Sequence, residues 1–399
     1  MIDWRTIKLE KVITDIAAGP FGSNLKVECF VESGFPIIDG ANLKGFKVTD
    51  NITKFVTEEK ARSLHRSIAK RNDVIVTISG NVGQIAYIPN DSKYIEYLVS
   101  QRQFRVSFDE SAIDVPYLVY YFHTREGQHK ILSFANQVGV PALAQPLKNF
   151  KAIELNLPSL PTQHSIASIL SSLDDKIDLL HRENKTLEAM AETLFRQWFI
   201  EEAKEDWEEK SLGKCLKLVG GGTPKTSEER FWNGKVCWLS GGDITNNHKS
   251  FVSCSEKSIS EDGLNNSSAK LLPENAMVVS ARGTVGKYCL LSKPMAFSQS
   301  NYGILPIYTD CYFFTYLLVA YHIEELQSAA YGSVFDTITT KTFEGVNVLL
   351  PQEPDYIVEF EKMIEPCFSK MKQNNNQIQT LTQQRDGLLP KLMSGEVKI

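Results

Sequence analysis

The feature that most constrains the fold of this chain is a run of side chains at alternating steps of four and three residues between positions 166 and 198. Such a run predicts the seam of a coiled coil, because an average spacing of 3.5 residues keeps one helix face turned toward a partner. Nine of its ten positions are apolar. The exception is Asn184, a residue type that fixes register within a seam. At about 1.5 Å per residue the helix would be roughly 50 Å long. The positions are Ile166, Leu170, Leu173, Ile177, Leu180, Asn184, Leu187, Ala191, Leu194 and Trp198.

A second seam of the same spacing runs from Ile357 to Leu392. It predicts a second long helix, which is the partner available to the first within the chain. A pseudo-two-fold relation between the halves of the chain would make the two helices antiparallel. The residues expected at the interface of this helix pair are Leu173, Ile177, Leu180, Asn184, Leu187, Leu194, Trp198, Met371, Asn374, Ile378, Leu381, Leu388 and Leu392.

The sequence before each seam is an internal repeat, which indicates two related domains. A single offset lays the first half of the chain on the second in two separate blocks. A further block before each long helix aligns without gaps. The matched residues are Trp4, Leu9, Gly19, Gly80, Val82, Gly83, Lys148, Phe150, Leu157 and Pro158 with Trp207, Leu212, Gly222, Gly283, Val285, Gly286, Lys341, Phe343, Leu350 and Pro351.

Each repeat has the pattern of an α+β domain. Short β-branched runs at 74–78 and 277–281 stop at glycine turns, as buried strands do. Residues 117–132 and 313–328 predict one substantial helix in each repeat, and alternating segments ending at Pro158 and Pro351 predict closing strands. We therefore expect an α+β fold in which two pseudo-symmetric domains are separated by a long antiparallel two-helix coiled coil. The expected parts are a first domain at 1–158, its helix at 159–206, a second domain at 207–351 and its helix at 352–399.

Length and composition are those of a globular protein with at least two domains, since 399 residues exceed one ordinary core. No run of eighteen apolar residues and no leader pattern occurs, so neither a membrane span nor a signal peptide is expected. The seven cysteines are scattered without a CxxC pair. This usage predicts reduced thiols and a cytoplasmic location.

The net charge of −5 is unevenly distributed. Residues 159–206 carry ten acidic and five basic side chains, which accounts for the acidity, and the two domains are near neutral. Charge by itself neither supports nor excludes a nucleic-acid partner, because a neutral domain can still present a basic face.

No pattern of a catalytic or metal site is present. The GGGTPKT segment at 220–226 does not satisfy the phosphate-loop pattern and is more typical of a turn. The sequence lacks GxGxxG, GxSxG and HExxH motifs, and its histidines do not pair with cysteines at zinc spacing. We therefore expect no catalytic residue and no metal ligand in this chain.

Basic and amide side chains in both domains suggest binding to DNA instead. Basic residues contact phosphates, and Asn, Gln and Arg can recognise base edges. Each cluster alone is typical of a solvated surface, but two clusters at the ends of a rigid spacer suit a DNA site with two half-sites. The candidate DNA-contacting residues are Lys44, Lys47, Arg62, Arg66, Lys70, Arg71, Gln84, Arg102, Lys225, Lys249, Arg282 and Lys287.

Over nearly its whole length the sequence resembles the specificity (S) subunit of type I restriction-modification enzymes. The resemblance lies in the duplicated W…L…G opening, the SGNVG and ARGTVG turns, the NLP and LLP exits, and the helix strings LDDKIDLLHRENKTLEAMAETLFRQWF and QIQTLTQQRDGLLPKLMSGEV. It implies two target-recognition domains, each recognising one half of a bipartite double-stranded DNA site. It also implies that the helices bind methyltransferase (M) subunits, expected to be two, and that motor-nuclease (R) subunits join them. The chain itself would bind no cofactor, while S-adenosylmethionine, ATP and magnesium would belong to the partner subunits.

Two functions therefore stand side by side at this point. In the first, the chain is a non-catalytic DNA-recognition subunit whose helix pair sets the gap between the half-sites. In the alternative, it is a two-domain coiled-coil adaptor that binds protein or another ligand. Salt-sensitive binding to duplex DNA in the presence of a methyltransferase partner distinguishes them.

Overall fold

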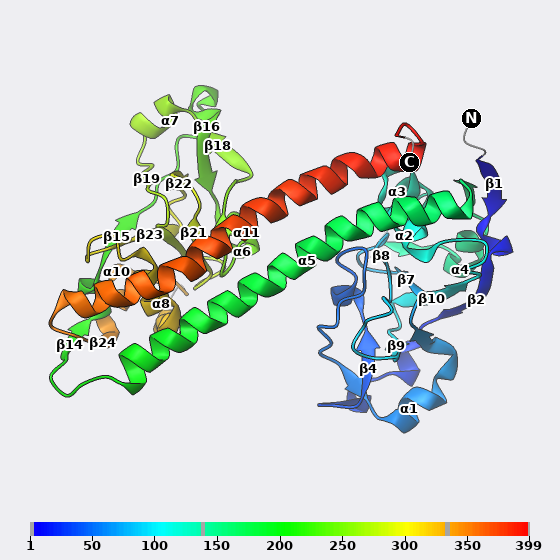
Figure 1. The fold of residues 1–399 in the computed structure, drawn as a ribbon, viewed down its shortest axis with the longest axis horizontal. Helices are drawn as coiled ribbons and strands as arrows, with labels where there is room; N and C mark the ends of the chain where they lie inside the picture. Colours follow the sequence, from blue (N-terminus) through cyan, green and yellow to red (C-terminus); the bar gives the residue numbers. More distant parts are fainter. Residues whose placement is uncertain (1–3, 137–139, 332–335, 398–399) are drawn as a thin grey trace. The chain divides into compact units, whose positions relative to one another are not determined.

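The computed structural model describes residues 4–136, 140–331 and 336–397, which fall into two compact units (Figure 1). Unit 1 combines Met1–Lys176 with Leu381–Ile399, and unit 2 is Ile177–Thr380. Two long helices, α5 (Leu160–Arg196) and α11 (Pro354–Ser394), each contribute one part to each unit.

The globular part of unit 1 is built around two sheets. The first has the strand order β2-β10-β7-β8 and the second the order β3-β5-β4-β9-β6, in which β4 and β9 are parallel. A strand pair, β1 with β13, joins the start of the domain to its end. The strands are β1 (Arg5–Lys8), β2 (Ile13–Ala18), β3 (Phe30–Val31), β4 (Phe35–Ile38), β5 (Phe55–Val56), β6 (Ile68–Lys70), β7 (Val74–Thr77), β8 (Ile85–Tyr87), β9 (Glu96–Val99), β10 (Gln103–Phe108), β11 (Ala135–Asn136), β12 (Ala142–Leu143) and β13 (Glu154–Leu157).

Unit 2 has a similar topology that differs in the edge strands of its two sheets. Its sheets have the orders β15-β23-β20-β21-β17 and β18-β16-β22-β19, the pair β16–β22 is parallel, and β14 pairs with β24. The duplication predicted from the sequence is therefore present in the strand connections as well. The strands are β14 (Glu208–Ser211), β15 (Leu216–Gly220), β16 (Trp232–Leu239), β17 (Phe251–Val252), β18 (Lys257–Ile259), β19 (Leu271–Leu272), β20 (Met277–Ser280), β21 (Tyr288–Leu291), β22 (Met295–Phe297), β23 (Asn301–Pro306) and β24 (Asn347–Leu350).

The α+β class is confirmed, but the prediction of one substantial helix in each repeat is wrong, because two helices stand where one was expected. In unit 1 the break falls at Thr124, whose extended backbone ends one helix and whose side chain caps the next by accepting from Gly127 N. A Cβ at Gly127 would lie 2.2 Å from the carbonyl oxygen of Tyr121, so this sharp junction requires glycine. In unit 2 the break falls at His322. The shorter helices are α1 (Glu58–Ser63), α2 (Val115–His123), α3 (Arg125–Leu132), α4 (Pro146–Lys151), α6 (Gly241–Asn246), α7 (Glu261–Asn265), α8 (Tyr312–Tyr321), α9 (Ile323–Tyr331) and α10 (Thr340–Gly345).

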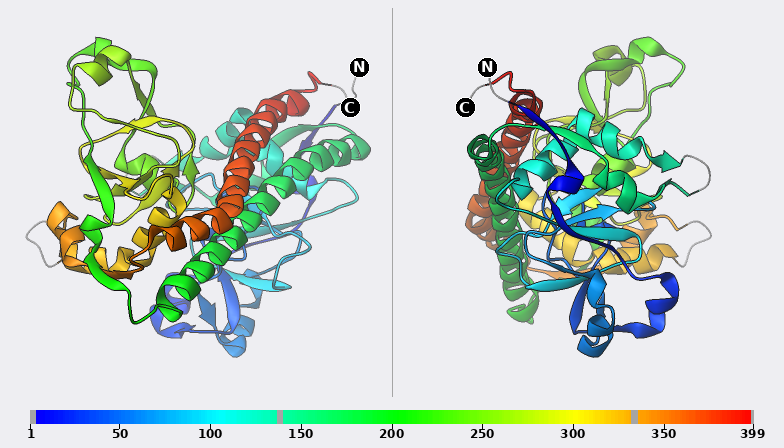
Figure 2. Two further views of the ribbon diagram at one scale, coloured as in Figure 1. Left: turned by 60° about the vertical axis from the view of Figure 1, so that its left-hand side comes forward. Right: turned by 90° about the vertical axis from the view of Figure 1, so that its right-hand side faces the viewer.

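Within each unit the two long helices lie side by side (Figure 2). In unit 2 their direction is antiparallel, since Asn184 of α5 contacts Asn374 of α11, whereas Trp198, farther along the chain, contacts Tyr356, which comes earlier. Near the end of α5, side chains that lie outside the predicted seam are also buried. Phe195 and Phe199 are almost fully buried there, and both rings pack against α8 and α11. Phe199 belongs to a π-helical turn at Gln197–Glu201 that follows α5.

Candidate nucleic-acid interface

The candidate site of unit 1 is built on the glycine turn that follows β7. Gly80 and Gly83 have φ values of +91° and +94°, a region in which a Cβ is strained. Gln128 of α3 holds the turn by donating from Nε2 to the carbonyl of Gly83 at 3.0 Å and to that of Phe122 at 2.8 Å. The turn is therefore fixed both by its own glycines and by a helix packed behind it.

Unit 2 builds the same turn after β20. Gly283 and Gly286 have φ values of +77° and +78°. Gln327 of α9 donates to the carbonyl of Val285 at 2.8 Å, in the place that Gln128 occupies in unit 1. A Cβ at Gly286 would lie 2.5 Å from Nε2 of this glutamine, so the helix contact and the glycine depend on each other.

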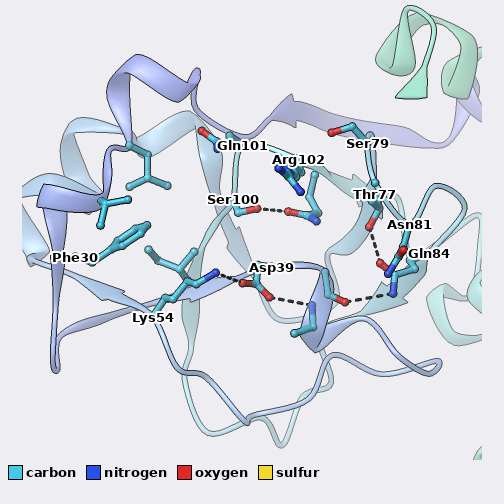
Figure 3. A pocket seen from close by; sticks show the side chains of 17 residues that line it. Phe30, Asp39, Lys54, Thr77, Ser79, Asn81, Gln84, Ser100, Gln101 and Arg102 are labelled. Atoms are coloured by element: carbon cyan, nitrogen blue, oxygen red, sulfur yellow. Dashed lines mark hydrogen bonds and ion pairs between the residues drawn. The ribbon is translucent and has the colours of Figure 1, made fainter. Parts of the chain in front are cut away.

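A short helical turn after β4 forms the second wall of the site in unit 1. Asp39 caps this turn by accepting from Ala41 N at 2.9 Å, and Lys54 donates to the same carboxylate at 2.6 Å. Burial would raise the pKa of Asp39, but these hydrogen bonds outweigh it and the pKa lies below its ordinary value. Gln84 bridges this wall to the glycine turn, since it donates to the carbonyl of Gly40 and accepts from Thr77 (Figure 3).

The third wall is the tight connection from β9 to β10, where Ser100 donates to the side chain of Gln103. Gln101 and Arg102 lie at its exposed tip. Together the walls enclose an open cavity of about 550 Å³. One side of the cavity is apolar, with Leu25, Val27, Phe30 and Ile37, and the other carries the polar side chains.

Of the predicted DNA-contacting residues of the first domain, only Gln84 and Arg102 line this cavity. Lys44 and Arg66 are exposed away from its lining. The remaining cations are engaged within the protein. Lys47 pairs with Asp175 of α5, Arg62 with Glu58 and Glu96, and Lys70 with Glu96, while Arg71 donates to the carbonyl of Ser92.

In the second domain, Arg282 and Lys287 flank the glycine turn, and Lys287 follows Gly286 as Gln84 follows Gly83. Lys225 is exposed on the loop after β15. Lys249, by contrast, donates to Glu192 of α5 at 2.9 Å. Burial would lower the pKa of Lys249, but the hydrogen bond that it donates to this carboxylate raises the pKa above its ordinary value.

The residues predicted at the helix pair differ in burial. Five are buried, namely Ile177, Leu180, Met371, Asn374 and Leu392. The other eight are partly buried, namely Leu173, Asn184, Leu187, Leu194, Trp198, Ile378, Leu381 and Leu388. In unit 1 the two helices are also joined by an ion pair that the seam did not predict, Arg385 with Asp174 at 2.7 Å, with both side chains largely buried.

Sequence reasoning missed two residues at the rim of the cavity, Asn81 and Gln101. Both are exposed amides beside residues that were selected, Asn81 within the SGNVG turn and Gln101 next to Arg102. The sequence does indicate a polar tip at this end of the sheet, because the polar string SQRQ directly precedes an apolar strand. Asn81 and Gln101 are uncharged, so positive charge does not identify them.

The described ranges give no sign of other site chemistry. They contain no group of three or more His, Cys, Asp or Glu side chains that could hold a metal ion. None of the described helices has the length and apolar character needed to cross a membrane. All seven cysteines fall in these ranges and are free thiols.

Comparisons with known proteins agree with the duplicated architecture. A family model described as the type I restriction modification DNA specificity domain matches residues 2–189 and 204–380. The MjaIX type I restriction enzyme specificity subunit of Methanocaldococcus jannaschii is 24% identical, covering 100% of this chain and 94% of the relative. The HindI specificity subunit of Haemophilus influenzae is also 24% identical, covering 82% and 87%. The crystal structure of the S subunit of a type I restriction-modification system from M. genitalium has a similar fold, with a TM-score of 0.64 at 15% identity over 98% of this chain and 96% of that one.

Proposed function

We propose that this chain, which belongs to the family of type I restriction modification DNA specificity domains, is the DNA-recognition subunit of a restriction-modification complex, with each globular domain contacting one half of a bipartite site. The observation that carries the proposal is the same glutamine-held glycine turn in both units, with polar side chains around it. Two similar recognition surfaces in one chain suit two half-sites, because each docks on its own stretch of groove.

The helix pair is proposed to set the gap between the half-sites and to bind two methyltransferase subunits. The net negative charge of residues 159–206, which include α5, supports a protein partner there, since negative charge repels phosphates. Motor-nuclease subunits would complete the restriction complex. S-adenosylmethionine, ATP and magnesium are assigned to these partner subunits, and the chain itself to a non-catalytic role.

The decisive experiment is co-expression of the chain with its methyltransferase subunit in a host free of other adenine methylation, followed by genome-wide mapping of methyladenine. The expected result is one motif with two short defined halves separated by a gap of fixed length. Methylation without a motif, or a motif that persists when the chain is omitted, would contradict the proposal.

A second measurement tests the non-catalytic role. The purified chain is incubated with duplex DNA carrying the mapped motif and labelled S-adenosylmethionine. We expect no transfer of label without the methyltransferase subunit and transfer when it is added. Transfer by the chain alone would assign catalysis to this protein.

A further inference from the structure

We propose that the cavity of the first domain is a purine-recognition site, in which Arg102 contacts the major-groove edge of a guanine and Asn81 and Gln101 contact neighbouring purines. This inference rests on the proposed function and adds the base chemistry of one half-site. The inference follows from a difference among the polar side chains around the cavity. Most of them are already hydrogen-bonded within the protein, and three are not.

Most polar side chains of the cavity are engaged within the protein. Gln84 is bonded to Gly40 and Thr77, Gln103 accepts from Ser100, and Asp39 is paired with Lys54. Asn81, Gln101 and Arg102 differ from them. All three are exposed, and within the described residues their side chains make no hydrogen bond or ion pair.

The backbone beneath these three side chains is nevertheless fixed. The carbonyl of Arg102 accepts from Ile78 N at 2.7 Å, and the carbonyl of Asn81 accepts from Gln84 N. The neighbouring Ser100 and Gln103 are tied by backbone and side-chain bonds. Side chains held on a rigid base but left without partners are preorganised for an external ligand, because little backbone order remains to be lost on binding.

The chemistry of the three side chains selects the ligand. A guanidinium can donate two parallel hydrogen bonds to O6 and N7 of guanine, and a carboxamide can pair with N6 and N7 of adenine. Both patterns are displayed in the major groove. All three side chains can also donate to phosphate oxygens. A carboxamide, however, carries both a donor and an acceptor, and this pair matches the N6 donor and N7 acceptor of adenine, whereas a phosphate offers acceptors alone.

The second domain provides an internal comparison. Ile78 N donates to the carbonyl of Arg102 in unit 1, and Ala281 N donates to that of Ser300 in unit 2. These bonds make Ser300 the counterpart of Arg102 and place Gln299 opposite Gln101. Thr284 stands opposite Asn81, but its hydroxyl is bonded to Thr245 and Ser280. A guanidinium at the Arg102 position is therefore present in unit 1 alone, while unit 2 carries its exposed arginine, Arg282, on the glycine turn at the position of Ser79. This predicts that the guanine contact of Arg102 has no equivalent at the same position of the second half-site.

The first test replaces Arg102 with its own counterpart, in Arg102→Ser, and maps methylation with the methyltransferase complex. The expected result is that one guanine of one half-site becomes degenerate, while the other half-site and the gap stay unchanged. Arg125→Ser removes an exposed arginine at the start of α3, outside the cavity, and serves as the control with the motif unchanged. A motif retained in full by Arg102→Ser, or a wild-type motif without guanine in either half, would overturn the inference.

The second test separates base contact from phosphate contact with Arg102→Lys, which keeps the charge but loses the planar fork. On a duplex with 7-deazaguanine in place of the guanine, the wild-type complex should bind about ten-fold more weakly, since N7 is lost. Arg102→Ser should show no further loss on this duplex, because its contact with N7 is already absent. Arg102→Lys should keep part of the loss, since a lysine can still donate to O6 or N7. Equal losses in wild type and Arg102→Ser, or full recovery of affinity by Arg102→Lys without any preference for guanine, would assign Arg102 to a phosphate.

These outcomes are distinct from failure of the proposed function. If the wild-type complex neither binds duplex DNA selectively nor methylates a motif, both ideas fail together. If the wild-type complex gives a bipartite motif that is insensitive to Arg102, the recognition role stands and only the assignment of the guanine contact is withdrawn.

Discussion

Asn184 and Asn374 hydrogen-bond to each other across the two long helices within unit 2, with Nδ2 of Asn374 donating to Oδ1 of Asn184 at 2.9 Å. Asn374 is fully buried, and its own Oδ1 has no partner within the described residues. Asn184 is partly buried and also donates to Asn375, while Asn374 also donates to Glu183. These bonds form in one alignment of the two helices, so a shifted alignment is opposed because it would break the bond between the two amides.

We therefore expect Asn374→Leu to lower the free energy of unfolding by about 1–3 kcal/mol, since Asn184 loses its donor in a partly buried site. The double variant Asn184→Leu/Asn374→Leu should recover much of this loss, because both polar groups are then gone. Denaturant unfolding measures both values. Asn376→Leu, on the exposed side of the same helix, is the matched control and should change stability by less than about 0.5 kcal/mol. A double variant as unstable as the single one would count against a paired role.

Glu361 of α11 predicts a pH dependence of stability in unit 2. Its carboxylate accepts from the backbone N–H groups of Phe313 and Phe314 at 3.0 and 2.7 Å, at the start of α8, and burial raises its pKa to about 7 from an ordinary 4.5. Between these pH values the folded chain binds a proton that the unfolded chain does not, so stability falls as the pH rises through this window.

The contribution of Glu361 is up to about 3 kcal/mol between pH 4.5 and 8. A glutamine side chain does not titrate, so Glu361→Gln should remove this part of the pH dependence of stability. The measurement is the difference in unfolding free energy between wild type and variant at several pH values. Parallel pH profiles for the two proteins would show that Glu361 does not titrate in this range.

The glycine turn of the first domain should not tolerate a side chain at Gly83. A Cβ there would meet Oε1 of Gln128 at 2.7 Å and would sit at a positive φ. We expect Gly83→Ala to cost about 1–3 kcal/mol and to weaken contact with one half-site only. Gly45→Ala, which has open space around the added atom, is the control. Competition binding with duplexes altered in one half at a time measures the effect, and equal loss on both halves would contradict it.

The ion pair of Lys249 distinguishes it from Lys225 as a DNA contact. Lys249 is bonded to Glu192, whereas Lys225 is exposed and its side chain has no partner within the described residues. Lys225→Gln should reduce the slope of log affinity against log salt by about 0.9, the value for one phosphate contact. Lys249→Gln should leave the slope unchanged. Titrations of the complex at several salt concentrations decide this, and equal slopes for the two variants would remove the distinction.

The proposed spacing role of the helix pair predicts that the gap of the DNA site follows helix length. Inserting one heptad into both α5 and α11 keeps the seam in phase and lengthens each helix by about 10 Å. Methylation mapping should then return the same half-site letters with a different gap. Altered letters with an unchanged gap would exclude this role, and an insertion in α5 alone is the control, expected to disrupt the pair.

The sequence by itself predicted the duplicated α+β organisation and the two long helices. Periodicity determines these features locally. A 3.5-residue spacing of apolar side chains over about thirty residues is the pattern of a coiled-coil helix. Gly80, Gly83, Gly283 and Gly286 mark turns whose positive φ values favour glycine. The sequence could not place the break at Thr124, because the apolar pattern continues across the junction between α2 and α3. That junction is created by the side-chain cap of Thr124 and by a close backbone contact at Gly127.

Only the tertiary structure decided which candidate side chains remain open to a ligand. Lys47, Lys249 and Arg102 are all cations in loops, and nothing local separates them. Asp175 and Glu192, brought close by folding, engage the two lysines, while Arg102 is left at the rim of a cavity. The physical reason is that charge and spacing are properties of the chain, whereas the partner of a charge is chosen by contacts between segments far apart in sequence.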